Sequence, residues 1–319
     1  MRALLYDQYG STEGLEIREI ERPTPKKNEV LVRVHAVSVN DWDLGLVHGQ
    51  GVNRVIGGLF GPKKIIGSDV AGRVVSVGSE VKRFRPGDAV FGDLCRSGFG
   101  GFAEYVCARE SALALKPERM TFEQAAAIPQ AGTLAYQGLF ARGPLKPGQK
   151  VLINGAGGGV GTFAVQIAKV RDVEVTGVDS AEKLDMMRSI GFDHVIDYRT
   201  EDFTKSGKRY DLILDTKTNR PLFDYLRALN PGGAYVTLGG TSHLAQVGLL
   251  GPWIGRLIKK RVFLVMLKPN KGLPYLCALF DAGKLLPVID GPYRFSHARE
   301  AIRLFEAARH RGKIVITID

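Results

Sequence analysis

The chain has 319 residues, of which 45% are hydrophobic and 24% are charged. At roughly 150 residues per domain this length predicts about two domains, and the composition excludes a disordered chain and a membrane-embedded class. The 44 Lys and Arg outnumber the 33 Asp and Glu and leave a net charge of +11, which favours an anionic partner without identifying it. Because the basic residues form no long arm and no RNA-binding aromatic motif, nucleic acid is not expected as the primary partner.

The cysteines and the apolar runs indicate the compartment. Three cysteines, Cys95, Cys107 and Cys277, form no CxxC pair, which is typical of a reducing environment. The apolar run at the N-terminus ends at Asp7 and is too short for the core of a signal peptide. No uncharged stretch is typical of a membrane-spanning helix. We therefore expect a cytoplasmic protein with no integral membrane segment.

Residues 1–124 read as a β-rich module. Short strands with β-branched residues are predicted at 29–39, 69–78, 88–93 and 102–108, and turn residues separate them.

From residue 125 the pattern changes to continuous apolar runs separated by segments of helical length. The runs lie at 150–155, 174–179, 194–198, 210–216, 234–240 and 261–267. Strands that are apolar on both faces are typical of a parallel sheet covered by helices. The sequence therefore predicts a doubly wound α/β domain. In the tail, two amphipathic helices each lead to a strand, and we expect this tail to return to the first module.

The strongest motif follows the run at 150–155, where a strand meets a glycine-rich turn and then a helix. The pattern Ala156-x-Gly158-x-x-Gly161 approximates the dinucleotide fingerprint, with an alanine in the first position. Gly158 would let the backbone approach a pyrophosphate, and Gly161 would allow close helix packing. Free amides at the start of the helix would bind the phosphates. The predicted loop comprises Gly155, Ala156, Gly157, Gly158, Gly159, Val160 and Gly161.

Asp179 ends the next strand, about 20 residues after this loop. Its carboxylate could accept both ribose hydroxyls of NAD and would repel a 2′-phosphate. Ser180 and Lys183 could instead bind a 2′-phosphate if the Asp179 side chain turns away. The sequence leaves the choice between NAD(H) and NADP(H) open.

The order of these modules resembles the medium-chain dehydrogenase/reductase superfamily, and local strings support the resemblance. Ser38–Asp43 is similar to the VNxxD element of that superfamily, Gly67–Gly72 to its GxDxAG turn, Gly101–Val106 to its GFAEY strand and Gly132–Tyr136 to its GTLAY element. The likeness is closest to the quinone oxidoreductase branch. It implies a GroES-like catalytic domain over 1–124, completed by 269–319, and a Rossmann cofactor domain over 125–268.

The resemblance also implies a site without zinc. Zinc alcohol dehydrogenases of this superfamily hold the metal with a Cys, a His-Glu pair and a second Cys. The matching positions here are Asn40, Ser68-Asp69 and Gln130. Without a Lewis acid, an alcohol has nothing to stabilise its alkoxide. We therefore expect NAD(P)H-dependent reduction of quinones or α,β-unsaturated carbonyls, in which conjugation spreads the developing charge.

By resemblance, Asn40 and Asp43 stand beside the nicotinamide as the catalytic pair, although turn capping would also explain them. The resemblance also implies cofactor contacts from Thr133, Tyr198 and Lys313. Gly239 and Gly240 follow a parallel strand, where the backbone can approach a cofactor, and Phe263 and Leu264 lie in the next strand near the expected nicotinamide. Capping, packing or solvation would also explain these residues.

Two alternatives remain open at this point. One is an enoyl-thioester reductase, and the other is a cofactor-binding sensor or RNA-binding protein without significant turnover. The expected partner is a small quinone or enone. A homodimer is also expected, in which the strand at 261–267 could pair at a sheet edge. The apolar run around Trp253 could shape a pocket or form an oligomer contact.

Overall fold

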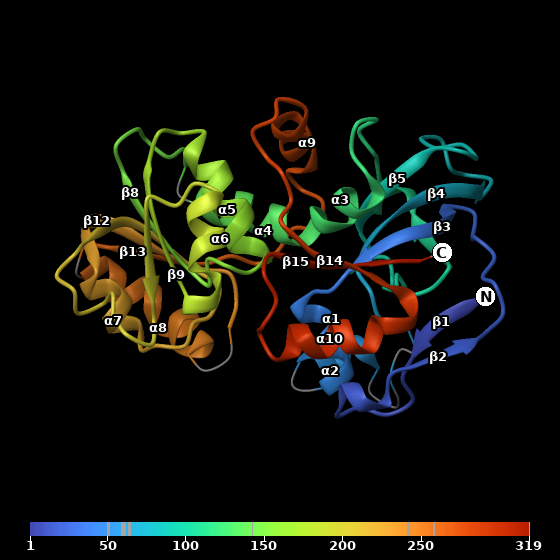
Figure 1. The fold of residues 1–319 in the computed structure, drawn as a ribbon, viewed down its shortest axis with the longest axis horizontal. Coiled ribbons are helices and arrows are strands. Elements are labelled where there is room, and N and C mark those ends of the chain that lie inside the picture. The colour runs from blue at the N-terminus through green and yellow to red at the C-terminus, as the bar shows by residue number, and fades with distance from the viewer. Residues whose placement is uncertain are drawn as a thin grey trace. The chain divides into compact units, whose positions relative to one another are not determined.

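The computed structural model describes residues 1–49, 52–58, 62, 65–141, 143–240, 243–257 and 259–318. The chain divides into two compact units (Figure 1). Unit 1 comprises Met1–Gln130, Pro269–Cys277 and Ile289–Asp319, and unit 2 comprises Ala131–Lys268 and Ala278–Val288. This division differs from the predicted boundaries, because residues 125–130 group with unit 1 and Ala278–Val288 group with unit 2.

Unit 1 is built on a seven-stranded sheet with the order β14-β15-β3-β4-β5-β7, in which β6 also pairs with β3. The first half of β3 pairs with β6, and Ala36, Val37 and Ser38 in its second half pair with β15. The register sets Ser38 opposite both Asp69 and Val315. The end of β3 therefore meets the starts of β4 and β15. The strands are β3 (Glu29–Ser38), β4 (Asp69–Val77), β5 (Ala89–Asp93), β6 (Tyr105–Arg109), β7 (Ala114–Leu115), β14 (Ile289–Arg294) and β15 (Lys313–Thr317).

A separate antiparallel pair and several helices complete unit 1. The pair is β1 (Arg2–Leu5) and β2 (Glu16–Glu19). The helices are α1 (Asp41–His48), α2 (Val52–Gly57), α3 (Phe122–Ala127) and α10 (Ala298–Glu306). Two more helices, α4 (Pro129–Leu139) and α9 (Leu273–Asp281), contribute residues to both units.

Unit 2 contains a six-stranded sheet that is parallel throughout, with the order β10-β9-β8-β11-β12-β13. This is the 3-2-1-4-5-6 order of the doubly wound dinucleotide-binding fold, which confirms the predicted class. Figure 1 shows α5 and α6 on one side of the sheet and α7 and α8 on the other. The strands are β8 (Lys150–Asn154), β9 (Glu174–Asp179), β10 (His194–Asp197), β11 (Tyr210–Asp215), β12 (Leu229–Thr237) and β13 (Arg261–Leu264). The helices are α5 (Gly159–Lys169), α6 (Leu184–Ser189), α7 (Leu222–Arg227) and α8 (Leu244–Leu257).

Some predicted elements differ from the observed ones in detail. The strand predicted over 261–267 ends at Leu264. The segment at 181–191 opens with a 3-10 turn over Ala181–Lys183 before α6 begins. The two strands predicted in the tail are β14 and β15. In the described part of the chain, no helix is both long enough and apolar enough to cross a bilayer.

Candidate functional site

A buried ammonium occupies the place in unit 1 where β3 meets β15. The Nζ of Lys313 donates to the Asn40 Oδ1 at 2.6 Å and to the carbonyl oxygen of Val39 at 2.9 Å. It lies 3.8 Å from the carboxylate of Asp69, and the side chains of Lys313 and Asp69 are 3% and 0% exposed. A charge this deeply buried must be paired and hydrogen-bonded. Lys313 is therefore a fixed cation beside Asn40.

Asn40 and Asp43, the predicted catalytic pair, lie together at the start of α1. The Asn40 N–H donates to one Asp43 carboxylate oxygen and the Gly67 N–H donates to the other, both at 2.8 Å. The Asn40 Nδ2 donates to the Ser68 Oγ at 3.2 Å. Burial raises the pKa of the Asp43 carboxyl to about 7, although these hydrogen bonds oppose the rise. Because both of its oxygens are engaged, Asp43 fits a positioning role better than direct contact with a substrate.

Two further carboxyl groups lie buried in the same unit. Asp69 accepts the Gln130 N–H at 3.0 Å, and Asp93 accepts the Cys95 N–H at 2.8 Å. Burial raises the pKa of both carboxyls and lowers the pKa of Lys313, while the charge of Lys313 opposes the rise at the acids. Sequence reasoning missed Asp93, although an acid that ends the apolar run at 88–93 was a usable signal.

In unit 2, the glycine loop runs from β8 into α5, and its backbone leaves little room for side chains. A Cβ at Gly161 would lie 2.3 Å from the carbonyl oxygen of Ala156, so α5 starts tightly against the loop. Gly155 has a φ of +81°, and a Cβ there would lie 2.1 Å from the Thr216 Oγ1. Gly158 precedes the helix as its N-cap. The first-turn amides that follow have no partner within a helix and can bind an anion.

The carboxylate of Asp179 is turned onto this loop. It accepts the Gly157 N–H at 2.8 Å and the Ser180 N–H at 2.9 Å. The Lys183 Nζ lies 3.4 Å from it, with side-chain exposures of 7% for Lys183 and 10% for Asp179. The loop, Asp179, Ser180 and Lys183 are thus brought together, and the Asp179 charge is largely engaged within the protein.

The other predicted cofactor contacts occupy varied places. Thr133 in α4 is fully buried, and its Oγ1 has no hydrogen-bond partner within the described ranges. Tyr198 is half-exposed, and its N–H donates to the carbonyl oxygen of Asp179 at 3.2 Å. Phe263 and Leu264 lie in β13. The Phe263 side chain is half-buried, and Leu264 is 38% exposed. Tyr198 therefore joins the loop region, whereas Lys313 lies in unit 1 with Asn40.

Asp215, at the end of β11, is a residue that sequence reasoning missed. It is fully buried and accepts hydrogen bonds from the Asn154 Nδ2 at 2.8 Å and the Tyr235 hydroxyl at 2.7 Å. The N–H groups of Lys217 and Thr218 also donate to it. An acid that closes a buried strand was again the available signal.

The turn after β11, which Asp215 stabilises through its hydrogen bonds, contacts the predicted glycines that follow β12. The Thr218 hydroxyl donates to the carbonyl oxygen of Gly239. Gly239 and Gly240 have φ values of +146° and +127°, and a Cβ at Gly240 would lie 2.2 Å from the carbonyl oxygen of Lys217. Asp215 thus shapes the carboxyl edge of the sheet, where ligands bind in folds of this kind.

We predict that Asp93→Asn stabilises the protein increasingly as the pH rises. Burial raises the pKa of Asp93, so the folded chain keeps a proton that the unfolded chain loses above about pH 4. The wild type therefore loses stability from about pH 4 up through the folded pKa, while the amide has no proton to lose. We expect the gain in the free energy of unfolding to be small near pH 4.5 and to grow as the pH rises to 8.5. Urea unfolding from pH 4.5 to 8.5 measures the free energy of unfolding of the wild type and of the variant. The control is Asp281→Asn, a change at an exposed residue. Parallel stability curves for wild type and Asp93→Asn would contradict the prediction.

Two protein-family models match the chain. The alcohol dehydrogenase GroES-like domain matches residues 26–118, and a model described as zinc-binding dehydrogenase matches residues 190–316. The first match lies within unit 1, and the second begins in unit 2 and ends in β15.

Related proteins match nearly the whole chain. It is 34% identical to the chloroplastic quinone-oxidoreductase QR1 of Triphysaria versicolor, over 99% of this chain and 98% of the relative. It is 32% identical to the chloroplastic NADPH-dependent alkenal/one oxidoreductase of Arabidopsis thaliana, over 99% of this chain and 79% of the relative. The structure of the quinone oxidoreductase from Coxiella burnetii matches with a TM-score of 0.91 at 29% identity, covering 100% of this chain and 99% of that one. The chain therefore belongs to the quinone oxidoreductase branch of the medium-chain dehydrogenase/reductase superfamily.

Proposed function

We propose that the protein is an NAD(P)H-dependent oxidoreductase that reduces quinones or α,β-unsaturated carbonyl compounds by hydride transfer, without a catalytic metal. The observation that carries the proposal is the glycine loop, whose free amides open α5 beside an Asp179 already engaged by the protein. The names of the relatives, a quinone oxidoreductase and an alkenal/one oxidoreductase, support the substrate class.

The residues of unit 2 fit a nicotinamide dinucleotide. The loop amides would bind its diphosphate, since an anion there meets both free N–H groups and the positive end of the helix dipole. The unpartnered hydroxyl of Thr133 and the turn of Gly239 and Gly240 would supply further contacts. When bound, a reduced nicotinamide supplies the hydride.

The residues of unit 1 do not fit zinc. Asn40 and Gln130 offer neutral amides and Ser68 a hydroxyl, whereas zinc favours thiolate, imidazole and carboxylate. The nearby carboxylate of Asp69 is paired with Lys313, whose ammonium would repel a dication. These residues therefore would not hold a catalytic zinc ion.

Asn40 is the residue of unit 1 that we propose acts on the substrate oxygen. The Lys313 ammonium binds its Oδ1, which leaves the Nδ2 as a donor, and one Nδ2 hydrogen is used by Ser68. A cation at the carbonyl end of an amide strengthens its N–H groups as donors. Hydrogen bonding from the Asn40 amide also lowers the pKa of Asp69, so a quinone or enone oxygen would replace Asp69 at the second Nδ2 hydrogen, which would stabilise the charge that develops on that oxygen. In this proposal, Lys313 and Asp43 position Asn40.

The activity itself is tested with purified protein and a panel of quinones, enones and a crotonyl thioester, by following NADPH and NADH consumption. We expect turnover with quinones or enones and little with the thioester. Gly158→Val serves as the inactive control, because a side chain at this position of the fingerprint would keep the backbone from approaching the pyrophosphate. Gly14→Val is a matched change in open space. Saturable cofactor binding without consumption of any acceptor would favour a sensor, and faster turnover of the thioester would favour an enoyl-thioester reductase.

We propose NADPH as the preferred cofactor. Asp179 already accepts two N–H groups and faces Lys183, so its carboxylate is poorly placed to accept ribose hydroxyls. Lys183, Ser180 and the half-exposed Tyr198 would then face a 2′-phosphate. The name of the Arabidopsis relative, an NADPH-dependent alkenal/one oxidoreductase, also supports NADPH.

Lys183→Ala should lower kcat/KM for NADPH by about tenfold or more, the value of one charge-assisted hydrogen bond, and should change kcat/KM for NADH little. Steady-state kinetics with both cofactors measure the effect, and the exposed Lys284→Ala is the matched control. A wild type that prefers NADH, or an equal loss with both cofactors, would argue against a 2′-phosphate contact.

Lys313→Met should lower kcat by about tenfold or more while leaving KM for NADPH nearly unchanged, because Asn40 loses the cation that polarises it. The double variant Asp69→Asn/Lys313→Met removes both buried charges and should regain stability without regaining kcat. Lys313→Arg should retain part of the activity. Full activity in the double variant would show that Lys313 has only a structural role. Activity that disappears on chelation and returns with zinc would overturn the metal-free proposal.

The oligomeric state and compartment stay predictions. In the described part of the chain, β13 is a terminal strand of the unit 2 sheet and pairs with β12, so a second copy could extend the sheet there. We propose a homodimer on this basis. The cytoplasmic location expected from the cysteine pattern stays a prediction.

A further inference from the structure

Helix α8 exposes an apolar stripe. Leu249, Trp253 and Leu257 follow one another at intervals of four residues and are 74%, 79% and 85% exposed. Residues at this spacing share one helix face. Gly251 and Gly255 are buried, and a Cβ at Gly251 would lie 2.5 Å from the Val262 side chain of β13. Small residues therefore seat the helix on the sheet while large apolar ones point away from it.

The sequence around this stripe lacks acidic residues. From Tyr225 to Phe280, 56 residues, there is no Asp or Glu, although such residues are frequent in the rest of the chain. The same stretch carries seven basic residues: Arg227, Arg256, Lys259, Lys260, Arg261, Lys268 and Lys271. The apolar face thus lies in a segment whose charged residues are all basic, and this charge favours an anionic partner.

A basic pocket adjoins the end of α8. It has a volume of about 280 Å³ and is lined by Thr204, Lys205, Gly207, Lys208, Arg209 and Arg227. Lys205 and Arg227 are ion-paired with Asp202 and Asp224, which lie outside the lining, whereas no ion pair is found for Lys208 or Arg209 among the described residues. The Nζ of Lys260 donates to the Leu226 carbonyl oxygen, which precedes Arg227. The N–H of Lys260 donates to the carbonyl oxygen of Gly255 in α8 at 2.8 Å. Lys260 therefore joins the end of α8 to this pocket.

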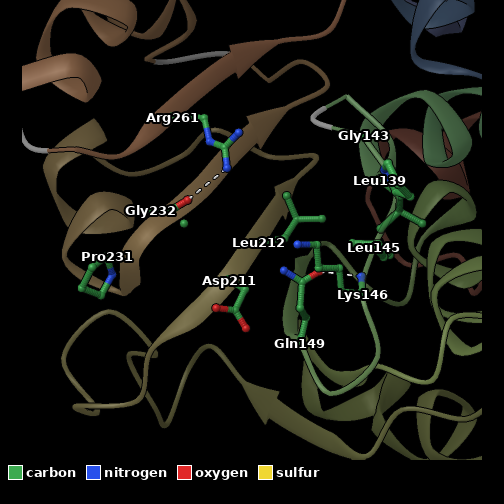
Figure 2. A pocket seen from close by; sticks show the side chains of 12 residues that line it. Leu139, Gly143, Leu145, Lys146, Gln149, Asp211, Leu212, Pro231, Gly232 and Arg261 are labelled. Atoms are coloured by element: carbon green, nitrogen blue, oxygen red, sulfur yellow. Dashed lines mark hydrogen bonds between the residues drawn. The ribbon is translucent and has the colours of Figure 1, made fainter.

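A second pocket, of about 410 Å³, continues the same amino-terminal edge of the sheet. Figure 2 shows Lys146 and Arg261 among its lining residues, with the Arg261 guanidinium bound to the carbonyl oxygen of Gly232. The one acid in its lining, Asp211, accepts hydrogen bonds from the Lys150 N–H and the Asn230 Nδ2, so its carboxylate is engaged within the protein. The basic character therefore extends along the edge.

We propose that the exposed face of α8 and this basic edge form a docking surface for an anionic lipid membrane. Trp and Leu side chains insert at the level of the lipid headgroups, while Lys and Arg attract the lipid phosphates. A second copy seated on the α8 stripe would bring like charges together, so the homodimer proposed above would use the backbone edge of β13 and not this stripe. The docking does not depend on the proposed reaction, and α8 would lie on the bilayer rather than cross it.

The test uses the full chain and vesicles of phosphatidylcholine, alone or mixed with phosphatidylglycerol. We expect flotation with the anionic vesicles only, weakened by salt because the attraction is screened. Lipids with brominated acyl chains should quench tryptophan fluorescence in the wild type and not in Trp253→Tyr. Equal binding to both vesicle types, or no binding to either, would overturn the proposal.

Two sets of variants separate the apolar and the basic contributions. Trp253→Ser/Leu257→Ser should abolish flotation while NADPH oxidation is unchanged. Arg256→Gln/Lys208→Gln should weaken the vesicle partition coefficient by about fivefold per charge. Lys27→Gln/Lys284→Gln removes the same net charge at exposed sites elsewhere and should change it little. An equal loss in this control pair would overturn the proposal. So would light scattering that shows a wild-type dimer dissociated by Trp253→Ser/Leu257→Ser.

Discussion

The buried ammonium of Lys313 constrains much of unit 1. Its charge lies where β3 meets β15, and the protein satisfies it with Asn40, Val39 and Asp69. Removing one partner of a buried ion pair costs about 3–5 kcal/mol, a large part of the roughly 5–15 kcal/mol by which a domain is stable. The tail strand and the residues before α1 are therefore held in one arrangement. The same cation orients the amide of Asn40, so the stability of the cluster and its proposed chemistry depend on the same contacts.

In unit 2, a buried carboxylate lies next to the loop that is proposed to bind an anion. An anionic diphosphate needs positive potential, yet Asp179 stands directly beside the loop. The protein engages that carboxylate with the N–H groups of Gly157 and Ser180 and with the ammonium of Lys183. The amides that open α5 are left free for the ligand. Because the Asp179 charge is met locally, the loop can bind an anion next to an acid.

The sequence predicted the local elements better than the contacts between distant ones. Continuous apolar runs identified the six parallel strands, and the glycine loop between β8 and α5 identified the nucleotide domain. The partner of Lys313 could not be predicted in this way, because Asn40 is 273 positions away and meets it only through strand register. Asp93 and Asp215 were missed for a similar reason, since an acid at the end of a strand is buried or exposed according to what packs over it. The unit boundaries differ because α4 and α9 each contribute to both units.

The two edges of the unit 2 sheet attract anions by different physical means. At the carboxyl edge, helix N-termini present neutral amides and the positive ends of helix dipoles. The helices end at the amino edge, and the negative ends of their dipoles favour Lys and Arg. Arg227 and Arg256 lie in the last turns of α7 and α8. Helix stability alone therefore explains these two members of the basic cluster. Helix stability does not explain Trp253 or Leu257, because an exposed apolar face gains nothing from water. The apolar stripe therefore points to a partner at the amino edge, and the absence of Asp and Glu from residues 225–280 favours a negatively charged partner.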